Sequence, residues 1–215
     1  MESKPNFINL LFFNYNYFSD DPLLSPFVIT RYFIIGTYVG CATIGIFAYW
    51  YIYFNHADGH SLISWDRLTT WTKCESWTDF TVNNYSGMDF SKQPCHYFTI
   101  GKKKPVTLAL TVLVIIEMLN AMNAISDESS LFSVPPTRNP YLLLAIFASV
   151  SVHCMILYVP FFNDIFGIMP LDTKEWILVL YFSVPVIIID EIIKFVVRNL
   201  LSRRNAHEIK HEHIE

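Results

Sequence analysis

Residues 105–125 constrain the fold of this chain more than any other stretch. They read PVTLALTVLVIIEMLNAMNAI and contain one formal charge, Glu117. A helix of this length spans roughly 30 Å, which is the thickness of the hydrocarbon core of a bilayer. The stretch therefore predicts a membrane-spanning helix with a carboxylate near its middle.

The chemistry of Glu117 leaves two interpretations open. A carboxylate at that depth is costly unless it is paired, protonated or bound to a cation. Asn120 follows three residues later, so a helix places its amide beside the carboxylate. Such oxygens suit calcium, which takes about six to eight oxygen ligands, more than one helix supplies. We expect either a calcium site completed by other helices or a protonated Glu117 hydrogen-bonded to a neighbouring helix.

Three further apolar stretches, at residues 27–54, 141–159 and 176–197, are long enough to cross a bilayer. The composition agrees, because 53% of the residues are hydrophobic, 16% are charged and the mean hydropathy is +0.34. A net charge of −4 argues against binding to nucleic acid. The sequence predicts an all-α polytopic membrane protein with four transmembrane helices in a lipid bilayer.

Individual residues within these spans predict specific contacts. Gly36 and Gly40 form a G-x-x-x-G motif, which permits close approach of another helix. His153 is expected to be a packed, hydrogen-bonded residue rather than a metal ligand. Pro185 predicts a break in the last span. Asp190 and Lys194 are four residues apart, which favours an ion pair near the membrane interface.

The polar loop at residues 55–104 contains Cys74, Cys95 and the sequence Asn84-Tyr85-Ser86, a possible N-glycosylation site. Two cysteines in one polar loop suggest a disulfide in an oxidising compartment, and the alternative is two reduced thiols in a cytosolic loop. Lys and Arg are divided almost equally between the two sides of the predicted membrane, so charge does not decide the orientation. The cysteines and Asn84 favour a luminal loop, with both termini cytosolic.

Four segments resemble a known family of membrane proteins. They are RYFIIGTYVGCATIG at 31–45, LTVLVIIEMLNAMNAISD at 110–127, SVHCMILYVP at 151–160 and VPVIIIDEIIKFVVR at 184–198. Together they resemble the last four membrane helices of sarco/endoplasmic-reticulum-type calcium pumps, the type IIA P-type ATPases. The long loop looks most like that of the plant and protist members.

The resemblance implies a role for several residues. Glu117 matches a glutamate in the eighth membrane helix that binds calcium directly, and Asn120 matches a polar neighbour that supports it. Cys74 and Cys95 match a pair that forms a disulfide in the luminal loop. The resemblance also implies an endoplasmic reticulum membrane location and a C-terminal transmembrane domain at residues 27–198. Residues 1–26 would then be an unmatched cytosolic segment, 160–175 a short loop and 199–215 a cytosolic tail.

We therefore expect a C-terminal fragment of an ATP-driven calcium pump, with calcium as the transported ion. The chain contains no Asp-Lys-Thr-Gly phosphorylation motif and no nucleotide-binding or actuator domain. Alone it is expected to be inactive, with Mg-ATP used only in the complete pump and with the remaining helices of the pump as partners. The alternative is a stand-alone membrane protein that binds or regulates a full-length pump. A passive channel or exchanger is disfavoured because no second span offers another carboxylate at mid-membrane depth.

Overall fold

The computed structural model describes residues 26–55, 59–124 and 140–212. Within these residues the regular structure is helical, apart from one isolated bridge between Tyr85 and Met88. Four of the described helical segments are long and apolar enough to cross a membrane: Ile29–Ile52, His96–Asn123, Pro140–Tyr158 and Thr173–Val197. The prediction of an all-α chain with four membrane spans is confirmed.

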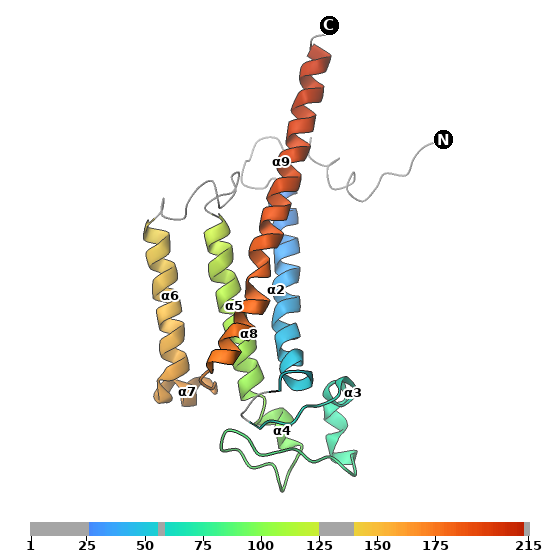
Figure 1. Ribbon diagram of the computed structural model, residues 1–215, viewed down its shortest axis with the longest axis vertical. Coiled ribbons are helices and arrows are strands. Elements are labelled where there is room, and N and C mark those ends of the chain that lie inside the picture. Colours follow the sequence, from blue (N-terminus) through green and yellow to red (C-terminus); the bar gives the residue numbers. More distant parts are fainter. Residues whose placement is uncertain (1–25, 56–58, 125–139, 213–215) are drawn as a thin grey trace, which may run out of the picture.

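Helix α5 (Lys103–Ala124) lies at the centre of the bundle, as Figure 1 shows. Helix α2 (Pro26–Ile52) packs along it, and α8 (Thr173–Ser183) and α9 (Pro185–Glu212) pack against both. Helix α6 (Pro140–Tyr158) contacts α5 at the edge of the bundle. Apolar side chains are buried where these helices pack together, and Ile46, Leu108 and Val179 are fully buried.

Pro185 divides the last span in two, as predicted. Helix α8 ends at Ser183 and α9 begins at Pro185, because proline has no N–H to continue the hydrogen-bond ladder. Helix α9 then continues through Glu212, so the segment expected as a polar tail begins as an extension of the last span.

The connection between α6 and α8, expected as a short loop, contains helix α7 (Pro160–Phe166). Pro160 lies in the first turn, where a backbone N–H would have no intrahelical acceptor, so proline costs no hydrogen bond there. Gly167 ends the helix with a left-handed φ of 62°. Asp172 and Glu175 form a capping box at the start of α8. These residues define where α7 begins and ends and where α8 begins, so much of the connection is helical.

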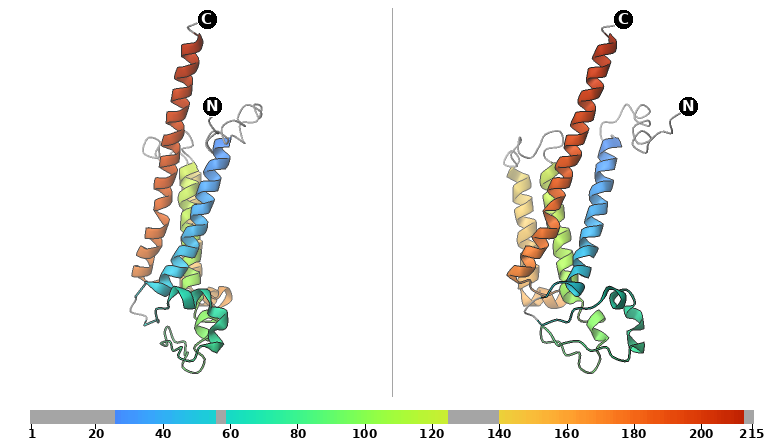
Figure 2. Two further views of the ribbon diagram at one scale, coloured as in Figure 1. Left: turned by 90° about the vertical axis from the view of Figure 1, so that its right-hand side faces the viewer. Right: turned by 45° about the vertical axis from the view of Figure 1, so that its right-hand side comes forward.

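The polar loop between α2 and α5 folds into a small subdomain with α3 (Trp65–Thr69), the 3-10 helix η3 (Trp71–Ser76) and α4 (His96–Thr99). Buried aromatic rings fill it, among them Tyr85, Phe90 and Tyr97. It lies at one end of the bundle, and the C-terminal half of α9 extends from the other end (Figure 2). We call these the loop end and the α9 end.

Candidate cation site on helix α5

Glu117 lies on the side of α5 that the described helices leave uncovered. Its side chain is exposed and continues a line of exposed residues, Val106, Leu110 and Leu113, along one side of the helix. The spacing of three, four or seven residues keeps this line on one helical face. We call these four residues the open stripe. A carboxylate therefore lies in the middle of an apolar span with no covering helix among the described residues.

Asn120 is half-buried one turn further along, which agrees with the predicted neighbourhood of the two side chains. Among the described residues, neither side chain makes a hydrogen bond or an ion pair. The described part of the chain also contains no group of three or more His, Cys, Asp or Glu residues that could hold a metal ion. A cation site that included these two residues would need its other oxygen ligands from outside the described residues.

The opposite face of α5 is packed and contains its own polar contacts. Thr111 is buried, and its hydroxyl lies 3.1 Å from His153 Nε2 on α6. The same hydroxyl donates to the Thr107 carbonyl at 2.8 Å. His153 is therefore a packed, hydrogen-bonded residue, as predicted, and these contacts attach α6 to α5.

A buried cluster of charges joins three helices towards the α9 end. Asp190 Oδ1 accepts a hydrogen bond from Arg31 Nε at 2.7 Å, and Asp190 Oδ2 lies 2.8 Å from Lys194 Nζ. Lys194 also donates to the carbonyl oxygen of Asn123, in the last turn of α5, at 2.9 Å. All four residues are buried. The cluster therefore fixes the end of α5 that lies less than two turns beyond Glu117.

Sequence reasoning predicted the Asp190–Lys194 pair but placed it at the interface, and it did not assign Arg31 a partner. In the structure the pair is buried, and Arg31 from α2 forms a second ion pair with Asp190. A signal was available in the sequence: Arg31 lies near the start of the first span and acidic residues lie near the end of the last one, so four spans place these charges at the same side of the membrane.

A second buried ion pair, also missed from the sequence, lies towards the loop end. Lys104 Nζ is 2.9 Å from Glu175 Oε2 and donates to the Pro170 carbonyl at 2.7 Å. The Glu175 side chain is fully buried. This pair joins the start of α5 to the start of α8, so both ends of α5 are held by buried charges.

Cys74 and Cys95 form a disulfide, which confirms the predicted pairing and rules out the alternative of two reduced thiols. The bond joins η3 to the start of α4 inside the loop subdomain. Asn84 lies elsewhere in the same subdomain, exposed at a tight turn.

Comparisons with known proteins agree with this arrangement. Residues 17–196 match the family described as cation transporting ATPase, C-terminus. Two similar relatives are the endoplasmic reticulum-type calcium-transporting ATPases 2 and 4 of Arabidopsis thaliana, at 49% identity over 193 residues and 47% over 190. Each alignment covers 84% of this chain and 18% of the relative.

A calcium-transporting ATPase of Plasmodium falciparum is 46% identical over 192 residues, which cover 89% of this chain and 16% of the relative. The chain thus spans less than a fifth of the length of these relatives. The similarity to plant and protist members agrees with the resemblance found in the sequence.

Proposed function

This chain belongs to the family of cation-transporting ATPase C-terminal domains, and on that premise we propose that it forms the last four membrane helices of a calcium pump. Its relatives are named as endoplasmic reticulum-type calcium-transporting ATPases. In this proposal the four helices support the transport helices of the pump, and Glu117 is one of the calcium ligands. Asn120 supports the carboxylate without being required to touch the ion.

The observation that supports this proposal best is the uncovered position of Glu117. An ionised carboxylate facing lipid at mid-membrane depth is strongly disfavoured. In a complete pump the open stripe would face other transport helices, whose oxygens would complete the six to eight that calcium prefers. Two buried polar residues of α5, Thr111 and Lys104, have their contacts with α6 and α8. Exposed Glu117 makes no such contact with the described residues, which leaves it for a ligand outside them.

The proposed chemistry of Glu117 is a change of charge during transport. The carboxylate is ionised while calcium is bound, because the cation offsets its desolvation. After calcium leaves, a proton from the opposite side neutralises the same group and avoids a bare charge in the membrane. Phosphoryl transfer from Mg-ATP would be performed by the rest of the pump, since the 215 residues contain no Asp-Lys-Thr-Gly motif.

We also propose an orientation in the endoplasmic reticulum membrane. Disulfides persist in oxidising compartments, so the disulfide between Cys74 and Cys95 favours a luminal loop subdomain. The described residues contain four helices long and apolar enough to cross the membrane, an even number, and the beginning of α2 and the end of α9 lie at the same end (Figure 1). Both would then be cytosolic.

A chimeric pump tests the proposal. Residues 27–198 replace the matching segment of an endoplasmic reticulum-type calcium-transporting ATPase, and ATP-dependent calcium uptake is measured in vesicles. We expect uptake by the chimera, loss of uptake with Glu117→Ala, and uptake unchanged by Glu75→Ala in the exposed part of the loop. Equal uptake by the chimeras with and without Glu117 would contradict the role of Glu117. An inactive but correctly inserted chimera, together with altered uptake when the separate chain is added to an intact pump, would favour the stand-alone interaction protein.

A further inference from the structure

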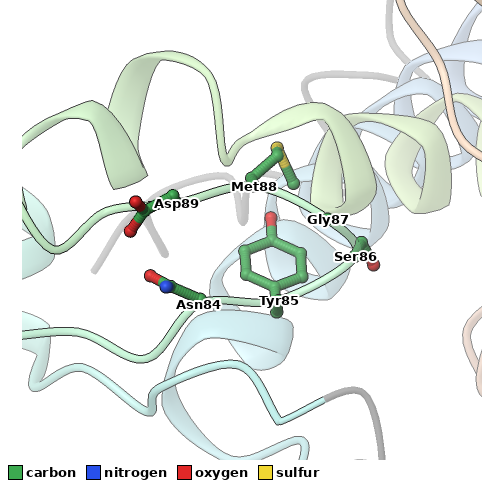
Figure 3. Close-up of a pocket in the computed structure, with 6 residues that line it drawn as sticks. All are labelled: Asn84, Tyr85, Ser86, Gly87, Met88 and Asp89. Atoms are coloured by element: carbon green, nitrogen blue, oxygen red, sulfur yellow. The ribbon is translucent and has the colours of Figure 1, made fainter.

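The turn at residues 84–89 contains the sequence Asn84-Tyr85-Ser86, the one Asn-X-Ser/Thr sequence in the chain (Figure 3). We propose that Asn84 is an N-glycosylation site that presents an oligosaccharide on the luminal surface of the loop subdomain. The proposal depends on the luminal orientation of the loop, which belongs to the proposed function. It does not depend on calcium binding at Glu117.

Tyr85 anchors the turn to the interior of the loop subdomain, while the residues on either side of it stay exposed. The Tyr85 side chain is buried, its ring stacks on Phe90, and its hydroxyl donates to the Gly101 carbonyl. Asn84 and Ser86 are both exposed, so the two residues that a glycosyltransferase must recognise are accessible to solvent.

The backbone of the turn is suited to this presentation. Ser86 and Gly87 have positive φ angles of 50° and 78°, and the Met88 N–H donates to the Tyr85 carbonyl at 2.9 Å. Two successive positive φ angles are the signature of a tight type I′ hairpin turn. The acceptor sequence thus lies at the tip of a hairpin, a position where a bulky surface modification is tolerated.

The hydrogen bonds of Asn84 are compatible with a sugar on its amide nitrogen. Asn84 Oδ1 accepts from the Phe90 N–H at 2.8 Å, and Asn84 Nδ2 donates to Ser91 Oγ at 3.4 Å. Glycosylation uses the nitrogen alone. The modified side chain therefore keeps its carbonyl oxygen for Phe90 and one N–H for either Ser91 or Asp89, so the bond from the Phe90 N–H that closes the turn is retained.

The reaction can be written in full. Asn84 Nδ2 attacks the anomeric carbon of an oligosaccharide linked to a lipid pyrophosphate, and a bond forms between nitrogen and carbon. The bond between that carbon and the pyrophosphate oxygen breaks, and the lipid pyrophosphate leaves with the electron pair. The nitrogen loses one proton to a base of the transferase. No oxidant or reductant is needed.

The neighbouring disulfide supports the same compartment for the modification. Cys74 and Cys95 lie on either side of Asn84 in the sequence, and their bond requires oxidising conditions. The lumen of the endoplasmic reticulum both oxidises thiols and transfers oligosaccharides. The disulfide therefore supports the location of this loop in the compartment where Asn84 would be glycosylated.

The test is expression of the full chain in cells, followed by digestion of the membranes with an endoglycosidase specific for N-linked sugars. We expect one shift in gel mobility that the enzyme removes. Asn84→Gln and Ser86→Asn should both abolish the shift. Ser86→Asn is the sharper variant, since asparagine accepts a positive φ and the turn is preserved. Asn83→Gln, the adjacent exposed asparagine outside the motif, should retain the shift.

A second readout separates failure of this proposal from failure of the luminal orientation. Lys92→Cys, a change at an exposed position, is treated with a membrane-impermeant maleimide in sealed vesicles, and labelling is measured relative to the unsubstituted chain, whose Cys41 and Cys154 are free thiols. Labelling only after permeabilisation, with no shift sensitive to the endoglycosidase, would overturn glycosylation and leave the luminal orientation intact. Labelling in sealed vesicles would overturn both. A shift that survives Ser86→Asn would also overturn the assignment of the sugar to Asn84.

Discussion

Arg31 Nε and Asp190 Oδ1 are 2.7 Å apart, although 159 residues separate them in the sequence. The contact joins the first described helix to the last, and both side chains are almost completely withdrawn from the surface. Lys194 contacts the second oxygen of Asp190 and reaches the end of α5 through the Asn123 carbonyl. One carboxylate thereby holds three of the membrane helices together.

Neutralising Asp190 should destabilise the bundle. Asp190→Asn leaves the charges of Arg31 and Lys194 buried beside a neutral amide, and breaking a buried ion pair in this way costs about 3–5 kcal/mol. Thermal unfolding in detergent measures the effect. Asp164→Asn, a matched change at an exposed position of α7, should leave the transition temperature unchanged. Equal transition temperatures for the two variants would contradict a stabilising role of the cluster.

Removing the charge of Lys104 should loosen the loop end of α5. Lys104→Met leaves Glu175 fully buried and without its cation, at a cost of about 3–5 kcal/mol. Two exposed neighbours, Lys102 and Lys103, provide controls that remove the same charge without affecting the pair. Hydrogen exchange at the start of α8 should increase in Lys104→Met alone. An equal increase in all three variants would indicate a general effect of charge rather than the buried pair.

Acid should weaken the hairpin at residues 84–91. Hydrogen bonds from the Ser91 hydroxyl, the Ser91 N–H and the Asn84 side chain hold the pKa of Asp89 below its ordinary value. A lowered pKa in the folded state means that ionised Asp89 stabilises the turn. This contribution to stability is fully present above the pKa of aspartate in the unfolded chain. It is lost as the pH falls from that value to below the lowered pKa of Asp89 in the folded chain.

The protection factor of the Ser91 amide against hydrogen exchange measures this contribution. Between neutral pH and strongly acidic pH, protection should fall in the wild type and in Asp66→Ala, an exposed control in the same loop. In Asp89→Ala, which removes the carboxylate without creating an Asn-X-Ser sequence, protection should be low at neutral pH and nearly independent of pH. Protection in the wild type that persists in strong acid would show that the Asp89 hydrogen bonds do not hold the turn.

Local sequence patterns were sufficient for the elements and for contacts within one segment. Apolar length predicted the spans, the missing N–H of Pro185 predicted the break between α8 and α9, and a four-residue spacing predicted the Asp190–Lys194 pair. The loop cysteines were also paired correctly. Each of these features depends on residues that are close in sequence or on a composition that one loop displays.

Contacts between distant helices could not be predicted in the same way. Arg31 meets Asp190 only because α2 packs beside α9, and Lys104 meets Glu175 only because α5 packs beside α8. Neither packing leaves a periodic signal in the sequence. Likewise, the carboxylate of Glu117 was recognisable from its depth in the span, but its uncovered position required the arrangement of the other helices.

The most direct test of the proposed calcium site is equilibrium calcium binding to the chimeric pump with Glu117→Gln, which removes the charge and keeps the shape of the side chain. Leu113→Ala, one turn away on the open stripe, is the matched control for altered helix packing. We predict that Glu117→Gln weakens calcium binding roughly tenfold or more, a loss of about 1.4 kcal/mol or more in binding free energy, while Leu113→Ala has little effect. Unchanged affinity in Glu117→Gln would show that this carboxylate is not a calcium ligand.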